Sequence, residues 1–151
     1  MNKYLWAAVI TILVAACARG GGETEDAFMK NWKEVAAAIK AQPGVTSAEA
    51  RFGASDVIFV DVEVSHEAIV AAGVTTLDTG ITPAMLGEAT HPVQFRITVP
   101  ALEGRYWWGE YDADAGRWTG IATHARPPHP DLEPHLNEAT GTYVVALPAE
   151  G

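Results

Sequence analysis

The sequence is poor in cysteine and in basic residues, and its N-terminal apolar run is shorter than a transmembrane helix. Cysteine occurs once, at Cys17, so no disulfide can close within the chain and the single thiol needs an explanation. Lysine and arginine number 10 against 19 aspartates and glutamates, and the formal net charge of −9 opposes binding to phosphate backbones. The apolar run Leu5–Ala16 is too short for a transmembrane helix, which needs about 20 residues. We therefore expect neither a disulfide framework nor nucleic acid as a partner, and no permanent membrane-spanning helix.

Residues that usually carry catalysis are scarce as well. The three serines, at positions 47, 55 and 65, do not lie in the Gly-x-Ser-x-Gly turn of a hydrolase nucleophile. His66 and Glu67 follow a serine, but they are more simply explained as the start of a helix. No glycine-rich segment of the kind that cradles phosphate follows a predicted strand. We expect a protein without enzymatic activity and without a cofactor.

The N-terminal residues have the three parts of a secretory signal: a positive start, an apolar core and small residues at its end. Lys3 is the only charged side chain before the run Leu5–Ala16, and Cys17 follows this run directly. The segment Leu13–Cys17 resembles the lipobox of bacterial lipoproteins, with Val14 where leucine is more common. An ordinary signal peptide with a chance cysteine, or a buried core helix, is the alternative interpretation.

The resemblance implies a lipid anchor. In bacterial lipoproteins this cysteine takes a diacylglyceryl group and becomes the first residue after cleavage. Residues 1–16 contain one lysine and no acid, so cleavage before Cys17 changes the formal net charge from −9 to −10. Ala18 is not the aspartate that favours retention in the inner membrane. The expected location is the extracytoplasmic side of the bacterial cell envelope, on the outer membrane in a double-membrane organism, with the membrane bound through the lipid on Cys17.

The remaining chain is expected to form one domain. We divide the sequence into a signal peptide (1–16), a lipidated cysteine with a glycine-rich tether (17–23) and a single α+β domain (24–151). A tether of this composition spans roughly 13 Å. Apolar residues make up 48% of the sequence, which is enough for a hydrophobic core.

The clearest element of that domain is a helix that begins near Thr24, a residue suited to capping. Apolar residues recur along it at spacings of four, three and four: Phe28, Trp32, Val35 and Ile39. This spacing places them on one helical face, and the pair Pro43-Gly44 ends the helix.

Alternating strands are predicted next, at residues 45–52 and 56–64. In the second of these, Asp61 and Glu63 should face outward while the apolar residues between and beside them face the core. The later elements are short helices, strands and loops, with a hairpin before a proline-rich segment: helices 65–72 and 82–89, loop 75–80, strand 93–99, hairpin strands 105–111 and 117–123, loop or extended arm 124–138, and strand 141–147.

These elements predict an α+β fold, a mainly antiparallel sheet with helices packed on one face. A helix-strand-strand pattern occurs twice, so a ferredoxin-like arrangement of two halves is one candidate.

Two segments resemble metal sites. His124, His129 and His135 lie within twelve residues and could supply zinc or copper ligands, but the intervening prolines stiffen the segment, and a solvated arm is the simpler explanation. The stretch Asp112–Gly116 resembles the start of a calcium loop, yet its twelfth position is Thr123 in place of an acid. A hairpin turn explains the same residues.

The densest aromatic stretch comprises Tyr106, Trp107, Trp108, Tyr111 and Trp118. In a strand, Trp107 and Trp108 must point to opposite faces, so one can fill the core while the other is exposed or covered. Exposed aromatic residues are favoured at binding surfaces, and stacking on a sugar is also compatible with them. Cross-strand aromatic packing is the alternative.

The sequence thus predicts a lipid-anchored, non-enzymatic protein of the cell envelope that binds a partner protein or an envelope component. The alternative is a lipoprotein that binds a small ligand or a glycan through the aromatic hairpin around Trp107 and Trp108.

Overall fold

The structure, a computed structural model, describes residues 29–102, 106–120 and 134–147, with the backbone alone for 102 and 106–108. The expected signal peptide, Cys17 and the tether lie outside the described residues. The chain divides into two compact units, Met1–Asn31 and Trp32–Gly151, and both sheets and the first helix from Trp32 onward belong to the second. Within the described residues, no helix is both long enough and apolar enough to cross a membrane.

The predicted first helix is present and covers residues 29–40. Three residues of its predicted apolar stripe are buried, with Trp32, Val35 and Ile39 at 1%, 8% and 0% exposure, and the fourth, Phe28, lies outside the described residues. The chain turns directly afterwards, where Gly44 adopts a positive φ of 84° and the amide of Val45 donates to the carbonyl of Gln42. The periodicity of the sequence therefore identified both this helix and its buried face.

Five strands form the larger sheet, called sheet A, in the order β1-β2-β4-β5-β6. Its strands are β1 (Val45–Phe52), β2 (Ile58–Val64), β4 (Val93–Thr98), β5 (Tyr106–Asp112) and β6 (Arg117–Gly120). Neighbours are antiparallel except β2 and β4, which are parallel. Along β2 and β4 every second residue is buried, so sheet A has one apolar face and one polar face.

The connection from β2 to β4 contains two short helices whose start signals were visible in the sequence. Helix α2 (His66–Ala72) begins after Ser65, whose hydroxyl accepts a hydrogen bond from the amide of Ala68. Helix α3 (Pro83–Glu88) begins after Thr82, which accepts from the amide of Met85 in the same way. A connection of this length is what parallel pairing of β2 and β4 requires.

A second, three-stranded sheet, called sheet B, has the order β3-β8-β7. Its strands are β3 (Thr76–Asp78), β7 (His135–Asn137) and β8 (Thr142–Ala146). Only β8 was predicted as a strand, because β3 lies in the predicted loop 75–80 and β7 in the predicted arm 124–138. A three-residue strand is too short to show an alternating pattern. Strands β3 and β7 exist because each pairs with β8, which is distant from β3 in the sequence.

The fold class is α+β, as predicted, but the strand order differs from a ferredoxin-like sheet. A ferredoxin-like sheet is built from split β-α-β units, in which another strand separates the two parallel strands. Here β2 and β4 are direct neighbours. The connecting segment also contributes β3 to a second sheet, so the two helix-strand-strand halves of the sequence do not become two equivalent halves of one sheet.

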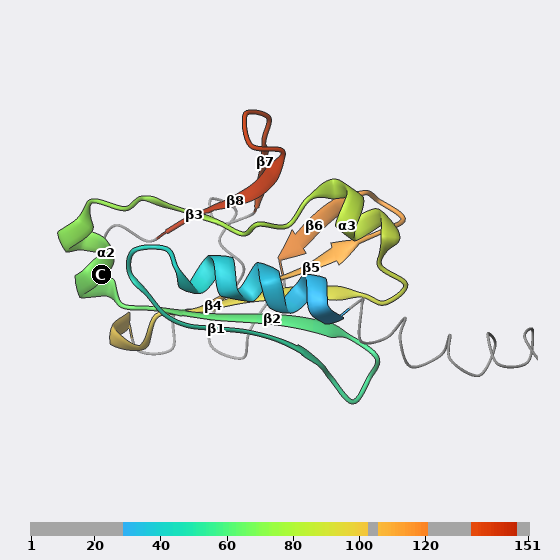
Figure 1. Ribbon diagram of the computed structural model, residues 1–151, viewed down its shortest axis with the longest axis horizontal. Helices are drawn as coiled ribbons and strands as arrows, with labels where there is room; N and C mark the ends of the chain where they lie inside the picture. The colour runs from blue at the N-terminus through green and yellow to red at the C-terminus, as the bar shows by residue number, and fades with distance from the viewer. Residues whose placement is uncertain (1–28, 103–105, 121–133, 148–151) are drawn as a thin grey trace, which may run out of the picture. The chain divides into compact units, whose positions relative to one another are not determined.

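The first helix, blue to cyan in Figure 1, is connected to sheet B by Gln42, which follows shortly after its last residue. The side-chain amide of Gln42 donates to the carbonyl of Asp78 at 2.5 Å, and its oxygen accepts from the amide of Asp78 at 3.0 Å. Thr79, which is fully buried, donates its hydroxyl proton to the carbonyl of Tyr143 at 2.8 Å. Side chains that complete backbone pairing thus connect the helix and β3 with β8.

Candidate functional site

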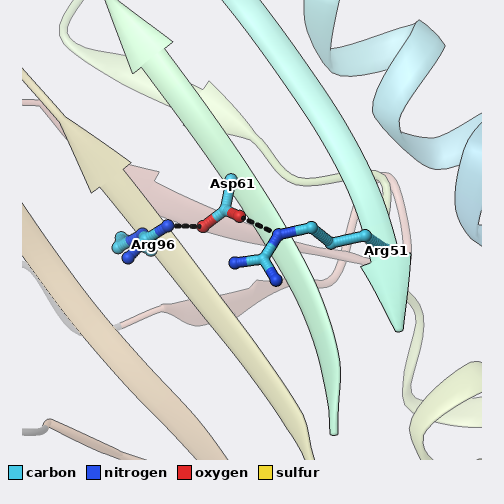
Figure 2. A network of polar contacts seen from close by, with 3 residues as sticks. All are labelled: Arg51, Asp61 and Arg96. Carbon is cyan, nitrogen blue, oxygen red and sulfur yellow. Dashed lines mark hydrogen bonds and ion pairs between the residues drawn. The ribbon is translucent and has the colours of Figure 1, made fainter. Parts of the chain in front are cut away.

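The polar face of sheet A carries a three-residue ion-pair network across its first three strands (Figure 2). The Nε atom of Arg51 on β1 lies 3.0 Å from Oδ2 of Asp61 on β2. The Nη2 atom of Arg96 on β4 lies 2.6 Å from Oδ1 of the same carboxylate, in a geometry that makes an ion pair but not an aligned hydrogen bond. One carboxylate therefore holds two guanidinium groups.

Arg51 also lies over an aromatic ring, with its guanidinium carbon 4.5 Å from the centroid of Phe59. This ring packs so closely on the turn after β1 that a Cβ at Gly53 would lie 2.2 Å from it. The absence of a side chain at Gly53 leaves room for the ring of Phe59 beneath the arginine. Ion pair and ring together orient Arg51, and arginine stacked on an aromatic face is a common feature of recognition surfaces.

Other polar groups on this face are also engaged with one another. The side-chain amide of Gln94 donates to Oε2 of Glu110 at 2.5 Å, and the hydroxyl of Thr119 donates to the carbonyl of Glu110 at 3.2 Å. The hydroxyl of Thr46 donates to Oε1 of Glu63 at 3.0 Å. The face is therefore a surface of oriented side chains in mutual contact.

Two of the five predicted aromatic residues are described in full, and they form a cluster with Tyr143 of β8. The rings of Tyr111 and Trp118 meet edge to face at 5.5 Å, and those of Trp118 and Tyr143 at 5.9 Å. Trp118 is only 4% exposed, so in this structure it belongs to the core and joins β6 of sheet A to β8 of sheet B. Its indole Nε1 is buried and has no hydrogen-bond acceptor among the described residues.

The other three aromatic residues are described by backbone register alone. Tyr106 pairs with Thr98, Trp107 with Ile97 and Trp108 with Arg96. Their side chains lie outside what the structure describes.

Burial raises the pKa of Tyr143 above its ordinary value of 10.0, and the neighbouring Tyr111 raises it further through its charge and a side-chain hydrogen bond. Burial and the neighbouring Tyr111 therefore both favour the protonated form of Tyr143. A neutral phenol that donates a hydrogen bond stabilises the contact between the sheets.

The segment that resembled a calcium loop is a hairpin turn. Oδ1 of Asp112 accepts hydrogen bonds from the amides of Asp114 and Ala115, at 3.0 and 2.9 Å. Gly116 then takes a positive φ of 64°, which closes the turn. The carboxylate of Asp112 is thus committed to its own backbone.

Of the three histidines considered as metal ligands, only His135 is described, as an exposed residue at the start of β7. His124 and His129 lie outside the described residues, as does the predicted lipidation site Cys17. Among the residues with described positions, no three His, Cys, Asp or Glu side chains gather as metal ligands would.

Sequence reasoning missed the network of Arg51, Asp61 and Arg96. Alternation correctly placed Asp61 on the outer face, but its partners come from two other strands. The parallel pairing that sets Asp61 beside Arg96 leaves no local pattern in the sequence. The antiparallel register that brings β1 alongside could have been read from the short turn between the strands.

The chain matches no known family model, no curated protein and no solved structure.

Proposed function

We propose that this protein is a lipid-anchored, non-enzymatic component of the bacterial cell envelope whose α+β domain binds a partner protein or an envelope component. The observation that carries the proposal is the segment Leu13–Cys17, in which the chain's single cysteine directly follows an apolar run that is preceded by one lysine. A diacylglyceryl group on Cys17 would hold the protein stably, because two acyl chains bind a bilayer where one is marginal.

The polar face of sheet A supports binding over catalysis. Asp61 is neutralised by two arginines, and Glu110 and Glu63 accept hydrogen bonds from neighbouring side chains. Carboxylates engaged in this way are poorly placed to transfer protons, whereas oriented arginines and aromatic rings favour recognition of a partner. We therefore assign the binding role to this face, around Arg51 and Phe59.

The anchor is tested by mass spectrometry of the full chain isolated from bacterial membranes. The proposal requires cleavage before Cys17 and a diacylglyceryl mass on that residue. Cys17→Ser should remain uncleaved and lose the lipid. Recovery of the unmodified chain with an intact N-terminus would overturn the anchor.

The binding face is tested by pull-down from native membranes with two variants that each remove one carboxylate charge. Asp61→Asn removes the charge that holds both arginines and should capture less material than the wild-type chain. Glu88→Gln, on the exposed surface of α3, should retain it. Circular dichroism of both variants shows whether the fold is kept, and equal capture by folded Asp61→Asn would remove this face from the proposal.

A second candidate function is binding of a small ligand or glycan by the aromatic hairpin. It is favoured by the buried Nε1 of Trp118, a donor without an acceptor, beside the two phenols of Tyr111 and Tyr143. A sugar hydroxyl that reached this cluster could accept the proton. Calorimetric titration with peptidoglycan fragments and simple saccharides would reveal such a ligand, and no heat above dilution would leave the partner-binding proposal alone.

A further inference from the structure

Strand β1 is one of the two edge strands of sheet A among the residues that the structure describes (Figure 1). It is eight residues long, and Thr46, Ser47, Glu49 and Arg51 are all exposed. An edge strand presents a row of backbone N–H and C=O groups that can pair with another strand. Natural edges are often blocked by proline or lysine, and β1 contains neither.

The residues of β1 are complementary to a second copy of themselves. We propose that two copies of this protein associate by antiparallel pairing of β1 with β1, about a twofold axis at Ala50. In this register Glu49 lies opposite Arg51 of the partner subunit, and the symmetry repeats the pair. On the other face Ala48 lies opposite Phe52 of the partner subunit, so a small side chain meets a large one.

The alternative registers are less favourable. An axis at Glu49 would place this carboxylate opposite itself, and an axis at Arg51 would place two guanidinium groups opposite each other. Like charges directly opposite across strands are destabilising, whereas opposite charges stabilise the pair. An axis at Ala48 places Glu49 opposite Ser47 of the partner subunit, so it forms no opposite-charge pair. The axis at Ala50 gives two opposite-charge pairs and keeps the polar faces of both sheets on one side.

Both charged groups lie on the exposed face of β1. Figure 2 shows the side chain of Arg51 reaching across β2 to Asp61, so pairing with a second copy requires this side chain to turn toward the free edge of β1. Glu49 is exposed and has no ion pair within the described part of the chain. Opposite residues in an antiparallel pair have Cβ atoms about 5 Å apart, so an Arg51 side chain turned toward the edge can reach the incoming glutamate.

Charge exchange tests the proposal, with the full chain purified in detergent and its mass measured by sedimentation velocity. The wild-type chain should be dimeric at micromolar concentration. Glu49→Arg places an arginine opposite Arg51 of the partner subunit at both symmetry-related positions. It should therefore raise the dimer dissociation constant by about tenfold or more. The double exchange Glu49→Arg with Arg51→Glu restores opposite charges and should restore the dimer. Glu88→Arg, with the same change of charge on α3, should have no effect.

Cross-linking tests the register independently, in the full chain with Cys17→Ser. Ala50→Cys is the only β1 substitution that lies opposite itself, so mild oxidation should give a covalent dimer. Ala48→Cys is displaced from its own copy by four residues, beyond the Cα separation of about 7 Å that a disulfide can bridge. A monomeric wild-type chain, a dimer unaffected by Glu49→Arg in a folded variant, or equal cross-linking of both cysteines would each overturn the proposal.

Discussion

Gly53 and Phe59 show how a single missing side chain shapes the polar face. The ring of Phe59 occupies the space in which a Cβ at Gly53 would lie, at 2.2 Å from Cε2 and 2.9 Å from Cδ2. Real Cβ atoms do not approach so closely, so any larger residue must displace the ring. Displacement would also disturb Arg51, whose guanidinium lies over the same ring.

We predict that Gly53→Ala lowers the free energy of unfolding by about 1–3 kcal/mol, the usual cost of forcing an extra methyl group into a packed site. Gly87→Ala is the matched control, because a Cβ at this position in α3 meets nothing within 4 Å. Alanine is the better helix former, so the control should gain up to about 1 kcal/mol. Urea unfolding of both variants measures the difference, and a loss at Gly87 as large as that at Gly53 would contradict the packing argument.

The ion pairs at Asp61 contribute little to stability by comparison. The side chains of Arg51, Asp61 and Arg96 are 43%, 22% and 33% exposed. Ion pairs on an exposed surface contribute up to about 1 kcal/mol each, because water screens the charges and two long side chains must be ordered. The network therefore matters mainly for the orientation of the arginines, in keeping with a role in binding.

At the scale of elements, a buried tryptophan of the hairpin of β5 and β6 packs against sheet B. Trp118 is the residue of the hairpin that contacts both Tyr111 beside it and Tyr143 on β8. Burial of a tryptophan removes a large apolar area from water, and edge-to-face contacts add to this. The connection between the two sheets therefore depends strongly on this side chain.

We predict that Trp118→Ala lowers the free energy of unfolding by about 3–5 kcal/mol, the range for truncating a buried aromatic residue. Trp118→Phe should cost less, because it keeps the ring contacts and removes the unsatisfied indole donor. Leu136→Ala is the control in sheet B, where the side chain is 43% exposed, and should change stability by less than about 1 kcal/mol. Thermal unfolding followed by circular dichroism compares the three, and similar losses for Trp118→Ala and Leu136→Ala would refute this role.

At the scale of the whole molecule, the contact between the sheets should make stability depend on pH. The pKa of Tyr143 is raised above 10.0 in the folded chain, chiefly by burial and further by Tyr111. Below pH 10 the phenol is protonated in both the folded and the unfolded chain. As pH rises above 10, the unfolded chain loses this proton before the folded chain does. The free energy of unfolding therefore falls until the pH reaches the pKa of Tyr143 in the folded chain.

We predict that the free energy of unfolding of the wild-type chain falls more steeply between about pH 9 and pH 11 than that of Tyr143→Phe. Lysines also titrate in this range, but they do so in both proteins and cancel in the comparison. Urea unfolding at a series of pH values provides the two slopes. Equal slopes would show that Tyr143 does not link the sheets through its proton.

The sequence alone was sufficient wherever a structure depends on neighbouring residues. The stripe of Trp32, Val35 and Ile39, the capping residues Ser65 and Thr82 and the hairpin turn at Asp112 all act within a few positions of the chain, and all are found in the structure. The lipobox-like segment is also a local pattern, and it remains a prediction because Cys17 lies outside the described residues.

Only the tertiary structure decided which distant segments meet. It paired β2 directly with β4, made strands of residues 76–78 and 135–137, and placed Trp118 in the core. It also brought Arg51 and Arg96 to one carboxylate. These features depend on contacts between residues far apart in the chain, whose free energy is realised only when the apolar faces are buried together, so no short segment of the sequence specifies them.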